Sequence, residues 1–148
     1  MEIEQILEKY KLQKEKDCWK HPQSGYWICY HDTCKKIADI ENIFTKDIQC
    51  LHSTEVSVRL LVTMIQLDKE SGKPMRQEIS IGEASKENVR MQGGYLGCMA
   101  EKRGKDRGIL RLIGAYDILK SEEESEEWEI KNLGFIAPSE KQVEYLLS

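Results

Sequence analysis

Three arginines spaced four residues apart are the residues of this sequence best suited to bind a ligand. Arg103, Arg107 and Arg111 fall on one side of a helix, because four residues make slightly more than one helical turn. None of the three has a carboxylate four residues away, and Lys102 and Lys105 flank the row. Guanidinium groups bind phosphate oxygens in a bidentate manner. The row therefore predicts contact with a phosphate backbone, and the alternative interpretation is a solvated helix face.

The charge of the chain is unevenly distributed, although the formal net charge is only −4. Residues 73–116 carry nine basic and five acidic side chains, whereas residues 117–148 carry three basic and nine acidic ones. A basic segment can bind a polyanion even when the whole protein is acidic. The pattern therefore favours nucleic acid as a partner of the basic segment, which an acidic C-terminal segment follows.

A second set of residues with useful chemistry lies nearer the N-terminus, in two Cys/His pairs that each enclose two residues. Its members are Cys18, His21, His31 and Cys34. Thiolate and imidazole ligands at such spacings can hold zinc in tetrahedral geometry. However, cysteines in an intracellular protein are most often small buried apolar side chains. Both interpretations stay open from the sequence.

Catalytic motifs are missing from the chain. The three histidines are not placed beside a nucleophile by any recognisable motif, and no GxxxxGK[ST] phosphate-binding loop is present. We therefore expect a protein that is not an enzyme and that needs no cofactor.

The apolar segments of the chain are all shorter than a membrane span requires. The N-terminal residues are charged and amphipathic, unlike a secretory signal. We therefore expect one cytoplasmic domain over residues 1–148 that makes no contact with membranes. Its expected parts are an N-terminal helix with the Cys/His loop (1–25), a core (26–116) and an acidic C-terminal segment (117–148).

Hydrophobic periodicity predicts helices before and after a group of strands. The expected helices and strands are helix 2–14, a helix from Asp32 or Thr33 to about Glu41, strands 48–51, 55–68 and 75–85, helix 96–116 and an acidic helix from Ser121. Grouped strands followed by a long helix indicate an α+β fold, in which an antiparallel hairpin or three-stranded sheet packs against the long basic helix. Within that helix, Gly97, Gly104 and Gly108 share one side, which favours close packing against a neighbour.

Several stretches together resemble a known family of phage proteins. They are WICYHDTCKKIADIENI, the hairpin after it, SIGEASKENV, and GCMAEKRGKDRGILRLIGAYDILKSEEE. In this combination they resemble the phage single-strand annealing proteins of the Rad fifty-two-like superfamily, which is grouped with the Redβ and Erf types. Gly82 matches the family's glycine at the end of the last strand, Lys102 and Arg103 match its basic pair, and Gly114 matches its helix-ending glycine. The resemblance covers about residues 26–124.

The resemblance implies a short helix, a hairpin with a third strand, and a long helix lying across the sheet. It also implies single-stranded DNA binding and ATP-independent annealing in phage-type recombination, by a homo-oligomeric ring or filament in the bacterial host's cytoplasm. The DNA would lie in a basic groove between hairpin and long helix. The implied contacts are Lys102, Arg103, Arg107 and Arg111, flanked by Lys105, with Arg59, Lys35 and Lys36 as further candidates. A phage exonuclease or a single-strand-binding protein is an implied partner.

Two alternatives remain open from the sequence. The first is a non-catalytic module of the same fold that binds a host repair or defence protein, which the acidic C-terminal segment favours. The second is a zinc-stabilised nucleic-acid-binding module that uses the Cys/His pairs described above.

Overall fold

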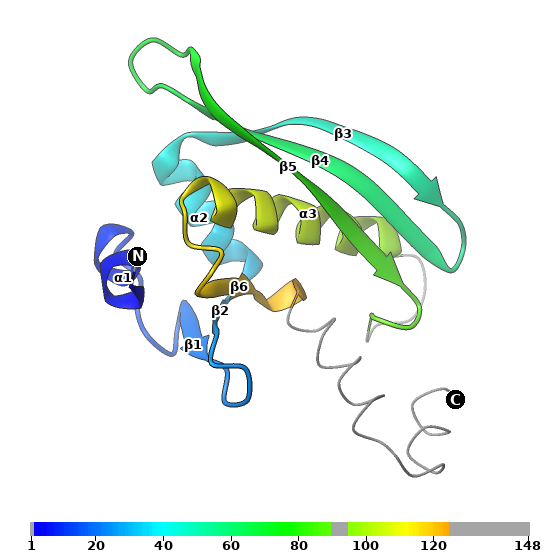
Figure 1. Ribbon diagram of the computed structural model, residues 1–148, viewed down its shortest axis with the longest axis horizontal. Helices are drawn as coiled ribbons and strands as arrows, with labels where there is room; N and C mark the ends of the chain where they lie inside the picture. The colour runs from blue at the N-terminus through cyan, green and yellow to red at the C-terminus, as the bar shows by residue number, and fades with distance from the viewer. Residues whose placement is uncertain (1, 90–94, 125–148) are drawn as a thin grey trace.

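A computed structural model describes residues 2–89 and 95–124 (Figure 1). The elements are α1 (Ile3–Lys9), β1 (Cys18–Lys20), β2 (Trp27–Cys29), α2 (His31–Glu41), β3 (Ile43–Ser53), β4 (Ser57–Leu67), β5 (Pro74–Ser85), α3 (Leu96–Leu112) and β6 (Leu119–Ser121). The expected mixture of helices with an antiparallel sheet is confirmed. No helix within these two ranges has the length and apolar character that crossing a membrane requires.

The larger sheet has the strand order β3-β4-β5, and both pairings are antiparallel. The expected hairpin is therefore confirmed, whereas the short strand expected at residues 48–51 is part of the longer β3. In β4, Val58 and Val62 are buried and Arg59 lies on the opposite, exposed side, as the sequence alternation predicts.

Helix α3 lies across one face of the larger sheet, against β4 and β5 (Figure 1). Helix α2 and strand β6 contact α3 as well, so the basic helix is surrounded by other elements. The main core joins residues of α1, α2, β4 and α3, among them Ile6, Ile37, Val62 and Leu110. Because α3 is central to the core, several of its polar residues are buried as well.

A smaller sheet, which sequence periodicity did not predict, has the order β1-β2-β6. Strand β1 pairs antiparallel with β2, and β2 pairs parallel with β6. Each of these strands has only three residues, too few to show an alternating pattern. Ser121, expected to begin an acidic helix, is the last residue of β6. Residues 122–124 after it are helical, and the Ser121 hydroxyl accepts a hydrogen bond from the Glu124 amide at 3.4 Å, as the capping signal predicts.

The ends of the helices correct the expected boundaries. The first helix ends at Lys9, well before residue 14, and Lys11 has the left-handed φ of 54°. Helix α2 ends at Glu41, as expected, and the Asn42 that caps it is also left-handed, with φ 58°. Helix α3 ends at Leu112, four residues early, because Gly114 turns the chain with φ 73° and the amide of Ala115 bonds back to the Leu110 carbonyl. Most of the expected acidic segment lies outside the described residues.

Two of the three glycines in α3 allow the helix to approach the sheet closely. A Cβ at Gly104 would lie 2.6 Å from Val62 Cγ2, and one at Gly108 would lie 2.6 Å from Met64 Cγ. Opposite them, a Cβ at Gly82 would lie 1.8 Å from the carbonyl oxygen of Ala100. Close packing is thus confirmed for Gly104 and Gly108, whereas Gly97 meets open space.

Candidate nucleic-acid interface

The arginine row of α3 does not form the exposed surface that the sequence predicts. Only 1% of Arg103 is exposed. Its guanidinium group donates hydrogen bonds to the carbonyls of Glu83, Asn88 and Glu123 and to the Asn88 side chain. These bonds satisfy the cation inside the protein, so Arg103 is corrected from a phosphate contact to a residue that holds α3, β5 and the following loop together.

Arg107 is also held within the structure. Its side chain is 19% exposed, donates to the Ile81 carbonyl at 2.6 Å and pairs with the Glu124 carboxylate at 2.9 Å. Burial lowers the pKa of Arg107, but Glu124 and Tyr116 together raise it by more, so the pKa is raised overall and the group stays charged. Arg103 and Arg107 together bond to carbonyls two residues apart along β5, Ile81 and Glu83, at its outer edge.

The groove expected between the hairpin and the long helix is therefore filled. Between the two elements there is no space even for a Cβ at Gly104, which would lie 2.6 Å from Val62 Cγ2, and the Ser80 hydroxyl donates to the Gly104 carbonyl at 2.6 Å. Single-stranded DNA has no room between these two elements without separating them. Any DNA contact must use the outer surface instead.

Three more of the predicted contacts face carboxylates. The ammonium of Lys102 lies 3.9 Å from Glu123, and that of Lys105 lies 3.6 Å from Glu101, four residues earlier in the helix. These distances are measured between nitrogen and carboxylate oxygen. A third pair joins Arg59 to Glu83 at 2.8 Å, on the exposed side of the larger sheet. Such surface pairs are weak and exchange readily, yet they reduce the net positive charge of the region.

The remaining candidates, Arg111, Lys35 and Lys36, are exposed. Within the described residues none of these three has a carboxylate within ion-pair distance. They are therefore the predicted contacts that stay available to an external anion.

Arg111 belongs to a cluster of cations and tyrosines that the sequence patterns did not reveal. Its guanidinium carbon lies 4.9 Å from the centre of the Tyr116 ring. The ammonium of Lys120 lies 3.2 Å from the same ring centre and 4.9 Å from that of Tyr26. We call Tyr26, Arg111, Tyr116 and Lys120 the cation–tyrosine cluster.

The electrostatics of the cation–tyrosine cluster follow from partial burial. Burial and the neighbouring Glu124 carboxylate raise the pKa of Tyr116 to about 12, and the Tyr116 hydroxyl donates to that carboxylate. Burial lowers the pKa of Lys120; the Glu124 and Asp117 carboxylates raise it, and the charges of Arg107 and Arg111 lower it further. Arg111 is the most exposed of the three cations in this region.

The edges of the stacked Arg111 guanidinium are the groups best placed to bind a ligand. When a guanidinium group stacks on an aromatic ring, its N–H groups point outward from its edges, parallel to the plane of the ring. There they can donate hydrogen bonds to phosphate oxygens. Aromatic side chains interleaved with cations are also the pattern that single-stranded nucleic acids bind. The signal in the sequence was the pair of tyrosines at positions 26 and 116, whose proximity depends on the pairing of β2 with β6.

The proposed zinc ligands are not brought together. The His31 imidazole Nδ1 lies 2.6 Å from the buried Asp106 carboxylate, and His21 accepts a hydrogen bond from the Ser24 amide. Cys34 lies instead beside Cys29, with 3.5 Å between the sulfur atoms. The described residues contain no group of three or more side chains placed to ligate a metal. The expectation that one zinc ion is held by Cys18, His21, His31 and Cys34 is therefore wrong for the arrangement seen here.

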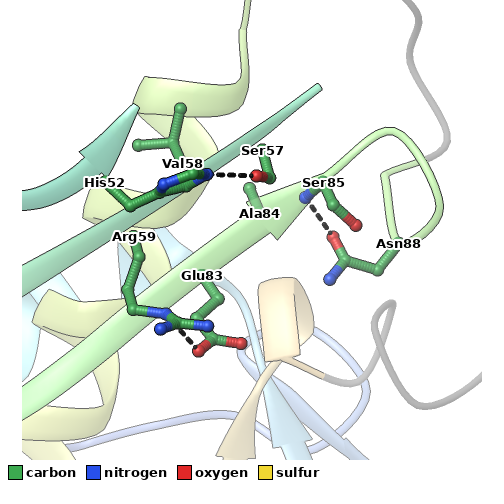
Figure 2. Close-up of a pocket in the computed structure, with 8 residues that line it drawn as sticks. All are labelled: His52, Ser57, Val58, Arg59, Glu83, Ala84, Ser85 and Asn88. Carbon is green, nitrogen blue, oxygen red and sulfur yellow. Dashed lines mark hydrogen bonds and ion pairs between the residues drawn. The ribbon is translucent and has the colours of Figure 1, made fainter. Parts of the chain in front are cut away.

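A polar pocket lies at one end of the larger sheet (Figure 2). It encloses about 160 Å³. The His52 imidazole bonds to the Ser57 hydroxyl at 2.8 Å, while the Glu83 carboxylate pairs with Arg59 and does not support the histidine. Among the pocket residues the arrangement lacks the carboxylate that orients the base of a hydrolytic triad.

Comparison with known proteins adds no relative to these observations. No protein-family model, curated protein or solved structure matches the chain.

Proposed function

We propose that the protein binds single-stranded DNA and promotes annealing of complementary strands without ATP, as a phage recombination protein. The observation that supports the proposal is the cation–tyrosine cluster, in which the exposed Arg111 stacks on Tyr116 beside Lys120. Cations there neutralise phosphate charge, and the ring of Tyr26, which is 38% exposed, offers a flat surface to an unpaired base. Neutralised backbones approach each other more easily, which is what annealing of two anionic strands requires.

The DNA-binding surface that we propose is centred on Arg111 and extends to Lys35 and Lys36 on α2, while Lys120, which is only 9% exposed, adds positive charge from beneath this surface. Lys102 and Lys105 contribute by exchanging their carboxylate partners for phosphate. Arg103 has a structural role in this proposal, and Arg107 positions Glu124 and the end of α3. The resemblance to annealing proteins further leads us to propose a homo-oligomer that works beside an exonuclease or a single-strand-binding protein.

Annealing of two complementary fluorescently labelled oligonucleotides tests this function. The protein should accelerate duplex formation in EDTA and without nucleotide, because neither a metal nor ATP takes part. A rate equal to that of the DNA alone, at protein concentrations that saturate binding, would contradict the annealing activity. Loss of binding itself would contradict the wider proposal.

A second candidate function is a module that binds a host repair or defence protein. The observation that favours it is the face of the larger sheet opposite α3, where Phe44, Ile79 and Ile81 are 51%, 49% and 39% exposed. Exposed apolar surface of this kind often marks a protein interface. This function predicts a stable complex with a protein whether or not DNA is present.

A further inference from the structure

The smaller sheet presents one face to the main core and the other face away from it. In Figure 1 this sheet lies below α3, whereas the larger sheet lies above α3. Cys18 and Cys29, which are paired in register, are both buried in the main core. Because side chains alternate between the two faces of a strand, the next row, Trp19, Ile28 and Lys120, points the opposite way. We call the face with this row the outer face of the smaller sheet.

Two tyrosines that flank β2 belong to the outer face. Tyr26 lies two residues before Ile28 and Tyr30 lies two residues after it, so the same alternation places both beside Ile28. Ile28 has no exposed surface, whereas Tyr26 and Tyr30 are 38% and 42% exposed. The outer face therefore offers two aromatic rings to solvent, on either side of a covered aliphatic side chain.

Each of the two exposed rings rests on a second group. The ring centre of Tyr30 lies 4.8 Å from that of Trp19, with 50° between the two ring planes. The Lys120 ammonium lies 4.9 Å from the ring centre of Tyr26. Contacts of this kind hold a ring in place, so less side-chain freedom is lost when a ligand stacks on it. We call Trp19 and Tyr30 the tryptophan–tyrosine pair.

The outer face connects the tryptophan–tyrosine pair to the cation at the centre of the proposed DNA-binding surface. Strands β1 and β6 lie on either side of β2, so the backbones of Trp19 and Lys120 are about 10 Å apart across the sheet. The Lys120 ammonium contacts the ring of Tyr116, on which Arg111 stacks. The Asp117 carboxylate offsets part of the Lys120 charge, so the accessible positive charge lies at Arg111. Exposed rings at one end and an exposed cation at the other complement the bases and the phosphates of a nucleic acid.

Unpaired nucleobases are the ligand that this arrangement fits best. Every base has a flat π face, and a sheet that exposes aromatic side chains can stack two or three bases of a single strand. Bases in a duplex are already stacked on one another, so their faces are not available. A protein partner is favoured by exposed aliphatic side chains, which the larger sheet carries, whereas Ile28 on the outer face is covered.

We propose that the tryptophan–tyrosine pair is a base-stacking position for single-stranded DNA. The proposal rests on the function proposed above and adds a second stacking position to the ring of Tyr26. Four residues separate Tyr26 from Tyr30, which is about 13 Å along an extended chain. Stacked neighbours in one DNA strand are only about 3.4 Å apart. The two rings therefore hold bases that are not adjacent, and the strand is extended between them.

Binding of fluorescent oligothymidine and of an abasic oligonucleotide of the same length tests the proposal, because only the first carries bases. The full chain should bind oligothymidine about tenfold more tightly, or tighter still, since that is the contribution of a stacked base. Equal affinities would overturn the proposal but not the proposed DNA binding, because phosphate contacts alone would then hold the strand. Failure to bind either oligonucleotide would contradict the proposed function, and this proposal with it.

Matched variants locate the stacking position. Tyr30→Leu should weaken oligothymidine binding about tenfold and leave the abasic oligonucleotide unaffected, because leucine still covers Ile28 but has no flat ring. Tyr30→Phe restores the ring and should bind as the natural protein does. Phe44→Leu is the control and should change neither affinity, since Phe44 is an exposed aromatic residue of the larger sheet. Undiminished oligothymidine binding by Tyr30→Leu, or an equal loss with the abasic oligonucleotide, would overturn the assignment.

Discussion

Arg103 and Asn88 are joined by two hydrogen bonds of 2.8 Å inside the protein, one to the side-chain oxygen and one to the carbonyl of the asparagine. Asn88 in turn accepts a bond from the Ser85 amide, so the loop after β5 is fastened to α3 through one cation. The most basic segment of the sequence thus contains a residue whose charge is used for internal structure.

Replacement of Arg103 should destabilise the fold. Arg103→Ala leaves several buried carbonyls without donors, and a loss of about 3–5 kcal/mol is expected when a buried charge-assisted network loses a member. Urea unfolding measures the change. Arg111→Ala is the control and should cost little, because its guanidinium is exposed. Equal stability of the two variants would show that Arg103 is not the link between α3 and β5.

Alanine at the closely packed glycines should also destabilise the protein. Gly82→Ala and Gly104→Ala place a methyl group against backbone or a β-branched side chain, which costs about 1–3 kcal/mol or more. Gly97→Ala in the same helix meets open space and should instead stabilise by up to about 1 kcal/mol. Thermal unfolding of the three variants measures these changes. Within α3, Gly104→Ala should lower Tm and Gly97→Ala should raise it.

The buried Asp106 should make stability depend on pH. Burial raises the pKa of Asp106, although His31, Ser121 and Lys102 act in the opposite direction. The folded protein therefore keeps the Asp106 proton to a higher pH than the unfolded chain, whose aspartates ionise near about 3.9. The contribution of Asp106 to the free energy of unfolding is therefore fully present below that pH. It is lost as the pH rises through the pKa that Asp106 has in the folded protein.

Asp106→Asn should consequently gain stability relative to the natural protein as the pH increases above about 4. Denaturant unfolding from acidic to neutral pH measures the difference. Asp68→Asn is a control of opposite sign, because bonds from Ser71 lower the pKa of Asp68 and its contribution is lost as pH falls. A constant difference between Asp106→Asn and the natural protein would refute the buried-charge explanation.

Removal of metal should leave the protein unchanged. His31 is engaged by Asp106, and His21 by a backbone amide, so a shared metal would require both to rotate away. Incubation with a zinc chelator is therefore expected to leave Tm within replicate error. A reproducible fall in Tm, reversed by added zinc, would restore the zinc-stabilised alternative.

Local sequence patterns predicted the parts of the structure that depend on local periodicity. Strand β4 shows this best, because Val58 and Val62 are both buried on the core side, as the alternation of apolar residues predicts. The burial of Arg103 could not be predicted, because the same four-residue spacing fits a row of exposed arginines and a set of arginines that are hydrogen-bonded inside the protein. The difference depends on β5, whose carbonyls lie 20 or more residues away in the chain. The cation–tyrosine cluster was missed for a similar reason, as β2 and β6 are separated by about 90 residues.

The most direct test of the proposed function is the affinity for fluorescent single-stranded DNA across a salt series, with duplex DNA alongside. We predict selective binding of the single strand that weakens steeply with salt, because phosphate contacts release counterions. Arg111→Glu should weaken binding and lower the slope by about one, whereas Lys73→Glu in the β4–β5 turn should not. No binding at low salt, or equal effects of the two variants, would contradict the account.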